Sequence, residues 1–160
     1  MNMRIQIQKL RNDAHLPYYA TPQSAGCDLI VPGNREDKVF IPFGRSVIKL
    51  GFAFSLPEGW EAQIRPRSGI SLKGLPDIYG ERHHNVSLVI GTIDADYRGE
   101  VGVIIHNREP GFYIEGGCRI AQMVISPIAH ANWVLCDELP ESSRGQSGFG
   151  HSGLFAPCSP

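Results

Sequence analysis

Glycine and proline interrupt the chain throughout and divide it into short apolar runs. The 160 residues include 18 glycines and 12 prolines, and within many of the runs between them every second residue is polar. Alternation with a period of two is typical of strands that bury one face. The sequence therefore predicts one all-β domain, a sandwich or a barrel, that is large enough to bury a core.

Several individual strands are expected from this alternation. Apolar and polar residues alternate at 3–7, at 48–54 and at 60–64. Because residues 56–59 (Leu-Pro-Glu-Gly) have turn composition, the runs on either side of them are predicted to form a hairpin. Residues 133–135 (Trp-Val-Leu) are predicted to be the last strand.

Charge, hydropathy and cysteine placement exclude several classes of protein. The formal net charge is −1, so no global field would attract nucleic acid or a membrane. The N-terminus has no apolar signal region and no run approaches membrane-spanning length, so a cytoplasmic protein is expected. The cysteines Cys27, Cys118, Cys136 and Cys158 lack metal-finger spacing, and reduced packing thiols are expected.

The most unusual stretch is 91–100, Gly-Thr-Ile-Asp-Ala-Asp-Tyr-Arg-Gly-Glu. Alternating runs at 86–90 and 101–105 flank it, so it is predicted to lie at or near the turn between two strands. Polar residues are common at hairpin tips, and this stretch alone does not distinguish a turn from a site. Asp94 and Asp96 would share one face of an extended chain, so their spacing does not identify which of them acts.

One short segment and two further positions are also candidates for ligand binding. Arg67, Ser68 and Gly69 would hold an anion if a short helix begins there, but Ser68 would equally serve as a helix N-cap. Asp28 precedes an apolar run and suits a turn. Gln122 lies inside an apolar strand, where its amide needs hydrogen bonds from the fold or from a ligand.

Two segments depart from the strand pattern. Residues 74–85 have no periodicity and are predicted to be a surface loop, in which the adjacent histidines would point apart and bind no metal. Residues 139–160 are rich in glycine and have little to bury, so the domain is expected to span 1–138. This tail is either a frayed terminus or an arm that orders over a ligand, with Arg144 for phosphate and Phe149 for stacking.

Taken together, five stretches resemble the motifs of the trimeric dUTP pyrophosphatases (dUTPases). They lie in order at 25–29, 66–69, 91–100, 117–124 and 144–153, and the third is the most specific. The resemblance covers nearly the whole chain. It implies a jelly roll or distorted β-barrel that assembles as a homotrimer with shared active sites and a flexible glycine-rich C-terminal arm.

The reaction that the resemblance implies is hydrolysis of dUTP to dUMP and pyrophosphate with Mg2+. This reaction limits uracil incorporation into DNA and supplies dUMP for dTMP synthesis. By resemblance, Asp94 deprotonates the attacking water, Tyr97 packs beneath the deoxyribose and excludes a 2′-hydroxyl, and Asp28 meets the metal through its water shell. The implied substrate-binding residues are Arg67, Ser68, Gly69, Leu88, Gly91, Thr92, Ile93, Asp94, Tyr97, Gln122, Arg144, Phe149 and Gly150.

Within that set, the residues of 67–69 and Gln122 would hold phosphate oxygens, and Arg144 would reach the γ-phosphate. Backbone groups around 88–91 would pair with the uracil edge, and Phe149 would cap the ring. Leu88 stands where some family members carry a base-reading asparagine. The other departures from the family pattern are Cys27, Cys118, Ser147 and His151.

Two alternative functions remain open from the sequence. A dCTP deaminase-like enzyme shares the fold, but the stretch around Asp94 resembles the pyrophosphatase pattern instead. A dUTP-sensing regulatory protein would signal through a partner. The segment between Ser68 and Asp94 is longer than the family usually has, and the excess at 75–84 is either a longer turn or a contact surface for a protein partner.

Overall fold

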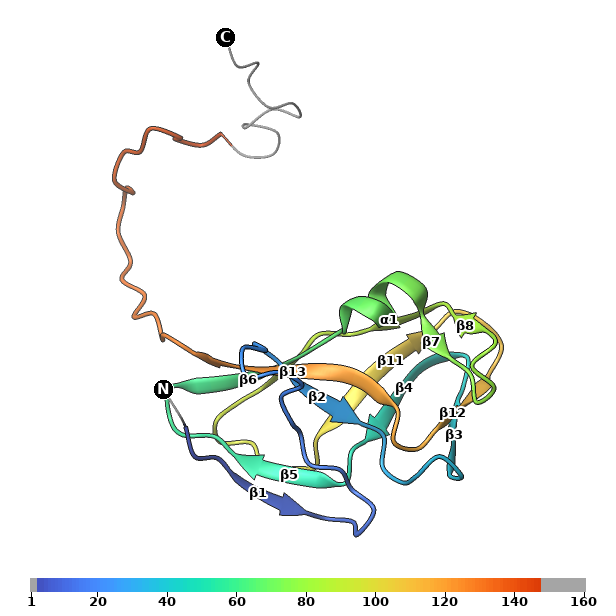
Figure 1. Ribbon diagram of the computed structural model, residues 1–160. Helices are drawn as coiled ribbons and strands as arrows, with labels where there is room; N and C mark the ends of the chain where they lie inside the picture. The colour runs from blue at the N-terminus through green and yellow to red at the C-terminus, as the bar shows by residue number, and fades with distance from the viewer. Residues whose placement is uncertain (1–2, 148–160) are drawn as a thin grey trace. The chain divides into compact units, whose positions relative to one another are not determined.

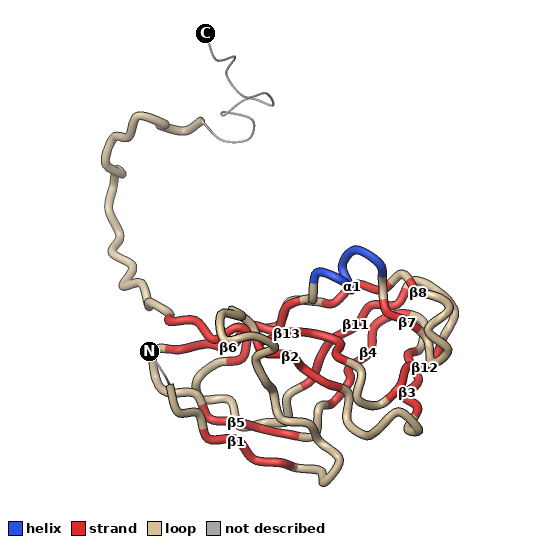
Figure 2. Tube along the Cα trace, viewed as in Figure 1, coloured by secondary structure: helices blue, strands red, loops and turns tan. Residues whose placement is uncertain are grey.

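The computed structural model describes residues 3–147, and these form an almost entirely antiparallel β-structure with one short helix (Figures 1 and 2). The elements in chain order are β1 (Gln6–Lys9), β2 (Cys27–Ile30), β3 (Lys38–Ile41), β4 (Gly44–Lys49), β5 (Phe52–Ser55), β6 (Trp60–Arg65), α1 (Ser68–Lys73), β7 (Leu75–Pro76), β8 (His83–His84), β9 (Val86–Leu88), β10 (Gly91–Ile93), β11 (Gly102–Asn107), β12 (Phe112–Glu115) and β13 (Arg119–Pro127). Within residues 3–147 no helix has the length and apolar character that a membrane-spanning segment needs.

The largest sheet has the strand order β10-β6-β13-β2. Its nine-residue strand β13 pairs with β6 on one side and with β2 on the other, as Figure 1 shows. A second sheet has the order β4-β11-β9, and the remaining strands pair as β1-β5, β3-β12 and β7-β8. All of these pairings are antiparallel, and together the sheets form a distorted barrel.

The core lies between the sheets and is built by alternating side chains. Along β11, Val103, Ile105 and Asn107 point inward and are fully buried, whereas Ile104 points outward. Asn107 satisfies its buried amide by donating to the carbonyl oxygens of Pro42 and Pro110 and by accepting from the backbone of Glu109. The largest other fully buried side chains are Phe52, Leu29, Ile41, Leu50, Leu75, Ile114 and Ile120.

Several sequence predictions are confirmed by this architecture. The chain is all-β, and a short helix begins at Ser68. The runs at 86–90 and 101–105 overlap β9 and β11, which pair with each other. The charged stretch between them is not a simple hairpin tip, because it first forms β10 and pairs with β6.

The predicted hairpin between 48–54 and 60–64 is wrong. The first run is divided at Gly51, whose φ of 75° bends the chain between β4 and β5. Strand β5 then pairs with β1, and β6 pairs with β10 and β13. Alternation identified the strands, but the partners are set by contacts between residues far apart in the chain.

The first strand is also displaced from 3–7 to Gln6–Lys9.

The predicted strand at 133–135 is also wrong. Strand β13 ends at Pro127, and Trp133 and Leu135 are 90% and 99% exposed. Three apolar residues do not form a strand without a partner strand to pair with. Residues Met1–Ala129 and His130–Pro160 separate into two units. In the second unit the described residues form local turns, such as Gly145 N donating to Ser142 O.

Of the cysteines that the structure describes, Cys27 and Cys118 pack in or against the core, whereas Cys136 is exposed. Cys27, Cys118 and Cys136 are free thiols. Burial raises the pKa of Cys27 and of Cys118, so both thiols stay protonated near neutral pH. The Cys27 thiol donates to the carbonyl oxygen of Met123 at 3.4 Å. Cys158 lies outside the described residues.

Candidate active site

Three of the five motifs line one cavity of about 320 Å3. It is bounded by Ala20, Ser24, Ala25, Gly26, Asp28, Arg67, Ser68, Gly69 and Gln122. Strand β13 brings these segments together, because its residue Gln122 lies opposite Asp28 on β2 and opposite Arg65 on β6. We call this the phosphate-side pocket, since it collects the residues that sequence analysis assigned to phosphate binding.

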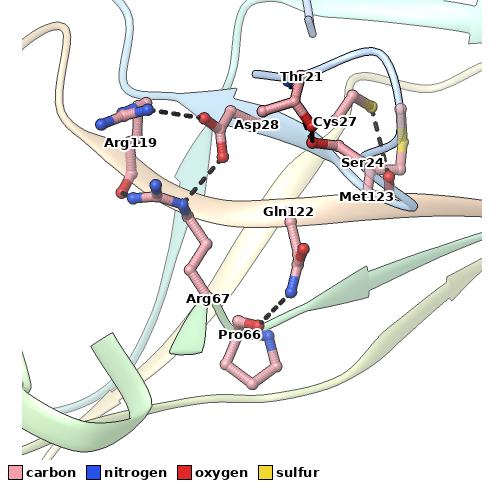
Figure 3. Close-up of polar contacts among 9 residues, drawn as sticks. All are labelled: Thr21, Ser24, Cys27, Asp28, Pro66, Arg67, Arg119, Gln122 and Met123. Carbon is pink, nitrogen blue, oxygen red and sulfur yellow. Dashed lines mark hydrogen bonds and ion pairs between the residues drawn. The ribbon is translucent and has the colours of Figure 1, made fainter. Parts of the chain in front are cut away.

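Asp28 lines this pocket and is only 6% exposed. Figure 3 shows its carboxylate between the side chains of Arg67 and Arg119. Its Oδ1 lies 2.9 Å from Arg67 Nε, and its Oδ2 accepts a hydrogen bond from Arg119 Nη1 at 3.1 Å. Arg67 also donates through Nη1 to the carbonyl oxygen of Arg119 at 3.1 Å. A buried carboxylate needs such partners, and its hydrogen bond raises the pKa of Arg119.

The ion pairs give Asp28 a role that the sequence pattern did not reveal. A turn aspartate would be exposed, but this one aligns two guanidinium groups whose side chains remain 30% and 46% accessible. Planar guanidinium groups suit the recognition of phosphate oxygens. Asp28 therefore holds Arg67 in a fixed orientation at the edge of the pocket.

Gln122 fixes the backbone that leads into the helix. Its Nε2 donates to the carbonyl oxygen of Pro66 at 2.9 Å, so the fold uses one of its two donor hydrogens. Gly26 packs closely against the same amide, because a Cβ there would lie 2.7 Å from Gln122 Oε1. The amide is thus both part of the fold and a lining group of the phosphate-side pocket.

The helix itself begins without a side-chain cap. Its N-cap residue is Arg67, which is extended and makes no capping hydrogen bond, so the interpretation of Ser68 as the cap is wrong. Ser68 and Gly69 are exposed, and a Cβ at Gly69 would meet nothing within 4 Å. Ile70 is buried and anchors the helix to the core. The Ser68 hydroxyl and the first turn consequently face open space.

The third motif lines a different cavity, of about 190 Å3. Its lining residues are Ile64, Gly91, Thr92, Ile93, Asp94, Tyr97, Glu100, Val101, Gly102 and Ile104. Asp94 follows the buried Ile93 and is exposed, and Tyr97 N donates to Asp94 O to close a turn. Asp96 is exposed but does not line this cavity, so of the two carboxylates only Asp94 lines it.

Leu88 contributes no side chain to this second cavity. It lies opposite Ile105, which points inward, and it packs against the core. The Leu88 side chain is thus used by the fold.

The cavity around Asp94 extends along β6, because Ile64 and its partner Gly91 both line it. In the antiparallel register Ile93 is opposite Ala62, which puts Asp94 beside the start of β6. Arg67 lies beyond the other end of the same strand. Asp94 is level with Glu61, and Arg67 lies six residues further along the chain. At about 3.3 Å per residue, this corresponds to roughly 20 Å. Within one chain, Asp94 and Arg67 are therefore separated by most of the length of β6.

The fifth motif is described only in part. Arg144 is exposed, and its Nε donates to Ser147 O at 2.8 Å within a local turn. Phe149, Gly150 and His151 lie outside the described residues.

The residues of the phosphate-side pocket do not fit a metal that the protein binds directly. Both oxygens of Asp28 are paired with arginines. Within residues 3–147 no group of three or more His, Cys, Asp and Glu side chains could hold an ion. The predicted divergence of the adjacent histidines is confirmed, because His83 is exposed and His84 is buried.

The segment at 74–85 is more ordered than the predicted loop. Strands β7 and β8 pair, and the His84 ring stacks on Phe112 with ring centroids 3.7 Å apart. Glu109 Oε2 lies 3.1 Å from His84 Nδ1 and 2.8 Å from Arg82 Nη2. Burial opposes ionisation of Glu109, but hydrogen bonds from Asn85, Arg82 and His84 and the charge of Arg82 lower its pKa. These contacts hold the hairpin formed by β7 and β8 in place.

Comparison with known proteins identifies the family of the chain. The family model described as dUTPase matches residues 12–153. The deoxyuridine 5′-triphosphate nucleotidohydrolase of Syntrophotalea carbinolica is 43% identical over 153 residues, which covers 94% of this chain and 97% of that protein. The chain therefore belongs to the dUTPase family.

Solved structures extend the likeness to the fold, which is the family's jelly roll. The dUTPase of Staphylococcus bacteriophage 80alpha, solved with dUpNHpp, is 27% identical with a TM-score of 0.80, over 96% of this chain and 100% of that one. The dUTPase of phage phi11 of S. aureus, which coordinates a structural Mg(II) ion, is 24% identical with a TM-score of 0.71, over 85% of this chain and 98% of that one. At that lower identity the likeness bears on the fold alone.

Replacing Asp28 by asparagine should lower stability. The neutral amide keeps the shape of the carboxylate but leaves Arg67 and Arg119 without a charged partner. Removing one member of a buried ion pair costs about 3–5 kcal/mol, and because both arginines are partly exposed we expect about 1–2 kcal/mol. Urea denaturation at one fixed protein concentration measures this free energy of unfolding.

The matched control is Asp96→Asn, since Asp96 is exposed. An exposed substitution of this kind should change stability by no more than about 0.5 kcal/mol. Equal stability of the two variants would show that the Asp28 ion pairs contribute nothing.

Proposed function

We propose that this chain hydrolyses dUTP to dUMP and pyrophosphate in active sites shared between the subunits of a homotrimer. The single observation that carries the proposal is the division of one family's motifs between two separate cavities, with Asp94 near the start of β6 and Arg67 beyond its end. Each cavity holds part of what the reaction needs. A complete site then requires the phosphate-side pocket of one chain and the Asp94 cavity of another.

The phosphate-side pocket supplies groups for the triphosphate. Arg67 is oriented by Asp28, and Ser68 and Gly69 present a hydroxyl and a backbone N–H in the open first turn of α1. Gln122 keeps one amide hydrogen free of its bond to Pro66. A triphosphate leaves little for a protein to do except positioning and charge stabilisation, and these are the groups that provide both.

The Asp94 cavity supplies the base and the sugar contact. The Asp94 carboxylate takes a proton from water as the water oxygen bonds to the α-phosphorus and pyrophosphate leaves. Tyr97 lines the same cavity, and its ring packs beneath the deoxyribose where a 2′-hydroxyl would collide. Backbone groups between Leu88 and Gly91 meet the uracil edge, since the Leu88 side chain packs into the core.

An apolar stripe beside the Asp94 cavity supports assembly. Val47, Val89, Ile90 and Ile104 are between 37% and 65% exposed. Ile104 lies opposite Val47 in the β4-β11 register, and Val89 N donates to Ile104 O, so at least three of the four adjoin. Adjoining exposed apolar residues of this kind mark protein contact sites. Because Ile104 also lines the cavity, a subunit packed on the stripe would reach the Asp94 site.

Magnesium enters this proposal with the substrate. Mg2+ keeps several waters and is usually bound through substrate phosphates and one or two carboxylates. Both oxygens of Asp28 are paired with arginines, so Asp28 would contact the metal only through a bridging water molecule. The ion would supply charge neutralisation on the phosphates.

Asp94→Asn should abolish turnover and preserve binding. The amide keeps the shape but cannot accept the proton, and loss of a general base typically lowers kcat by about 10²- to 10⁴-fold. Pyrophosphate release measures kcat, and calorimetry with a non-hydrolysable dUTP analogue measures affinity. Asp96→Asn is the control and should remain near wild type, while the reverse ranking would transfer the role to Asp96.

The glycine-rich tail is proposed to be an arm that closes the site, with Arg144 for the γ-phosphate and Phe149 over the uracil. Ending the chain at Glu138 should leave a folded oligomer with little activity, because the described residues from 139 to 147 are exposed and add nothing to the core. Stacking of an aromatic ring on a base is worth about 1–3 kcal/mol, so Phe149→Ala should reproduce part of the defect. Equal kcat for truncated and full-length protein at saturating dUTP would remove the arm from the mechanism.

A further inference from the structure

The ring of Tyr97 folds back onto the backbone of its own loop. A Cβ built at Gly99 would lie 2.3 Å from Tyr97 Oη and 2.5 Å from its Cζ. These separations are far below ordinary van der Waals contact, so no other residue fits at position 99 while the ring stays in place. The backbone at Gly99 is not in the left-handed region. Glycine is thus required here by the neighbouring ring and not by the chain conformation.

Glu100 holds the same ring and ties it to the core. Tyr97 Oη donates to the carbonyl oxygen of Glu100 at 3.2 Å. The Glu100 carboxylate in turn accepts a hydrogen bond from Gly51 N at 2.8 Å, at the bend between β4 and β5. The next residue, Val101, is 1% exposed, and its N donates to Phe52 O at 2.9 Å. The contacts of Glu100 and Val101 with the core therefore fix the Glu100 carbonyl that accepts the hydrogen bond from the Tyr97 hydroxyl.

Arg98 closes the loop from the outside. Its Nη1 donates to Ala95 O at 2.7 Å and to Tyr97 O at 2.8 Å. These bonds hold the backbone on both sides of the turn that starts at Asp94. The backbone of the loop is thus held independently of the ring, so a displaced ring need not unfold the loop.

We propose that Gly99 and Glu100 are positioning residues that set sugar selectivity by fixing the angle of the Tyr97 ring. This inference rests on the proposed function, in which Tyr97 excludes the 2′-hydroxyl. Tyr97 is 45% exposed, so burial alone does not fix its side chain. The Gly99 backbone below the ring and the Glu100 carbonyl at its hydroxyl supply the missing constraints.

The atoms that would clash in Gly99→Ala belong to the far end of the Tyr97 side chain and not to the backbone. The substitution should therefore tilt the ring and leave the fold intact. A tilted ring opens space beside the sugar. We expect the ratio of kcat/KM for dUTP to that for UTP to fall by about tenfold or more, since displacement of a positioning group by about 1 Å has effects of this size.

A double-mutant cycle tests whether Gly99 acts through Tyr97. Wild type, Gly99→Ala, Tyr97→Ala and the double variant are compared by the dUTP/UTP ratio, with thermal unfolding as the check on folding. Gly99→Ala should lower the ratio in the wild-type background and have no further effect when Tyr97 is alanine. Equal effects in both backgrounds would overturn the inference.

Glu100 is tested by a conservative pair. Glu100→Gln keeps an oxygen that accepts from Gly51 N and should retain the wild-type ratio, whereas Glu100→Ala should lower it. Loss of selectivity in both variants, or in neither, would contradict a positioning role for this contact.

The same variants distinguish the role of Tyr97 from the roles of Gly99 and Glu100. If Tyr97→Ala leaves the dUTP/UTP ratio unchanged, the proposed role of Tyr97 is wrong. If Tyr97→Ala lowers the ratio but Gly99→Ala does not, Tyr97 keeps its role and only the positioning inference is overturned.

Discussion

Strand β6 is the constraint on which the organisation of the site depends. It is paired on both sides, with β10 along one edge and β13 along the other, so its length and direction are fixed by two hydrogen-bonded ladders. Asp94 lies near the start of the strand and Arg67 beyond its end. This sheet thus separates Asp94, the proposed base, from Arg67 and the other groups proposed to bind phosphate.

The aspartates near the two ends of β6 lie in opposite environments. Asp28 is buried and paired with two arginines, so its negative charge serves to hold Arg67 and Arg119. Asp94 is exposed on a loop whose neighbours are fixed by Glu100 and Arg98. A carboxylate that must accept a proton needs freedom from ion pairs, whereas one that orients arginines needs burial. The two aspartates are therefore suited to different roles, Asp28 to orienting arginines and Asp94 to the proton acceptance that we propose.

The sequence allowed the elements and the motif residues to be predicted, but not most of their partners. Period-two alternation located β6, β9 and β11 because it depends only on neighbouring residues. The hairpin prediction failed because alternation does not specify which strand pairs with which. The bond from Arg119 to Asp28 joins residues 91 positions apart, and the bond from Gly51 to Glu100 joins residues 49 apart. No local pattern encodes either contact.

The central claim is that Asp94 and Arg67 of one active site belong to different chains. The direct measurement is the activity of mixed oligomers made by refolding Asp94→Asn and Arg67→Ala variants together in equal amounts. If sites are shared, random assembly gives intact pairs in about a quarter of the sites, and dUTP hydrolysis should recover to about a quarter of the wild-type rate. Activity no greater than the sum of the two separate variants would place both residues in one chain's site and contradict the account.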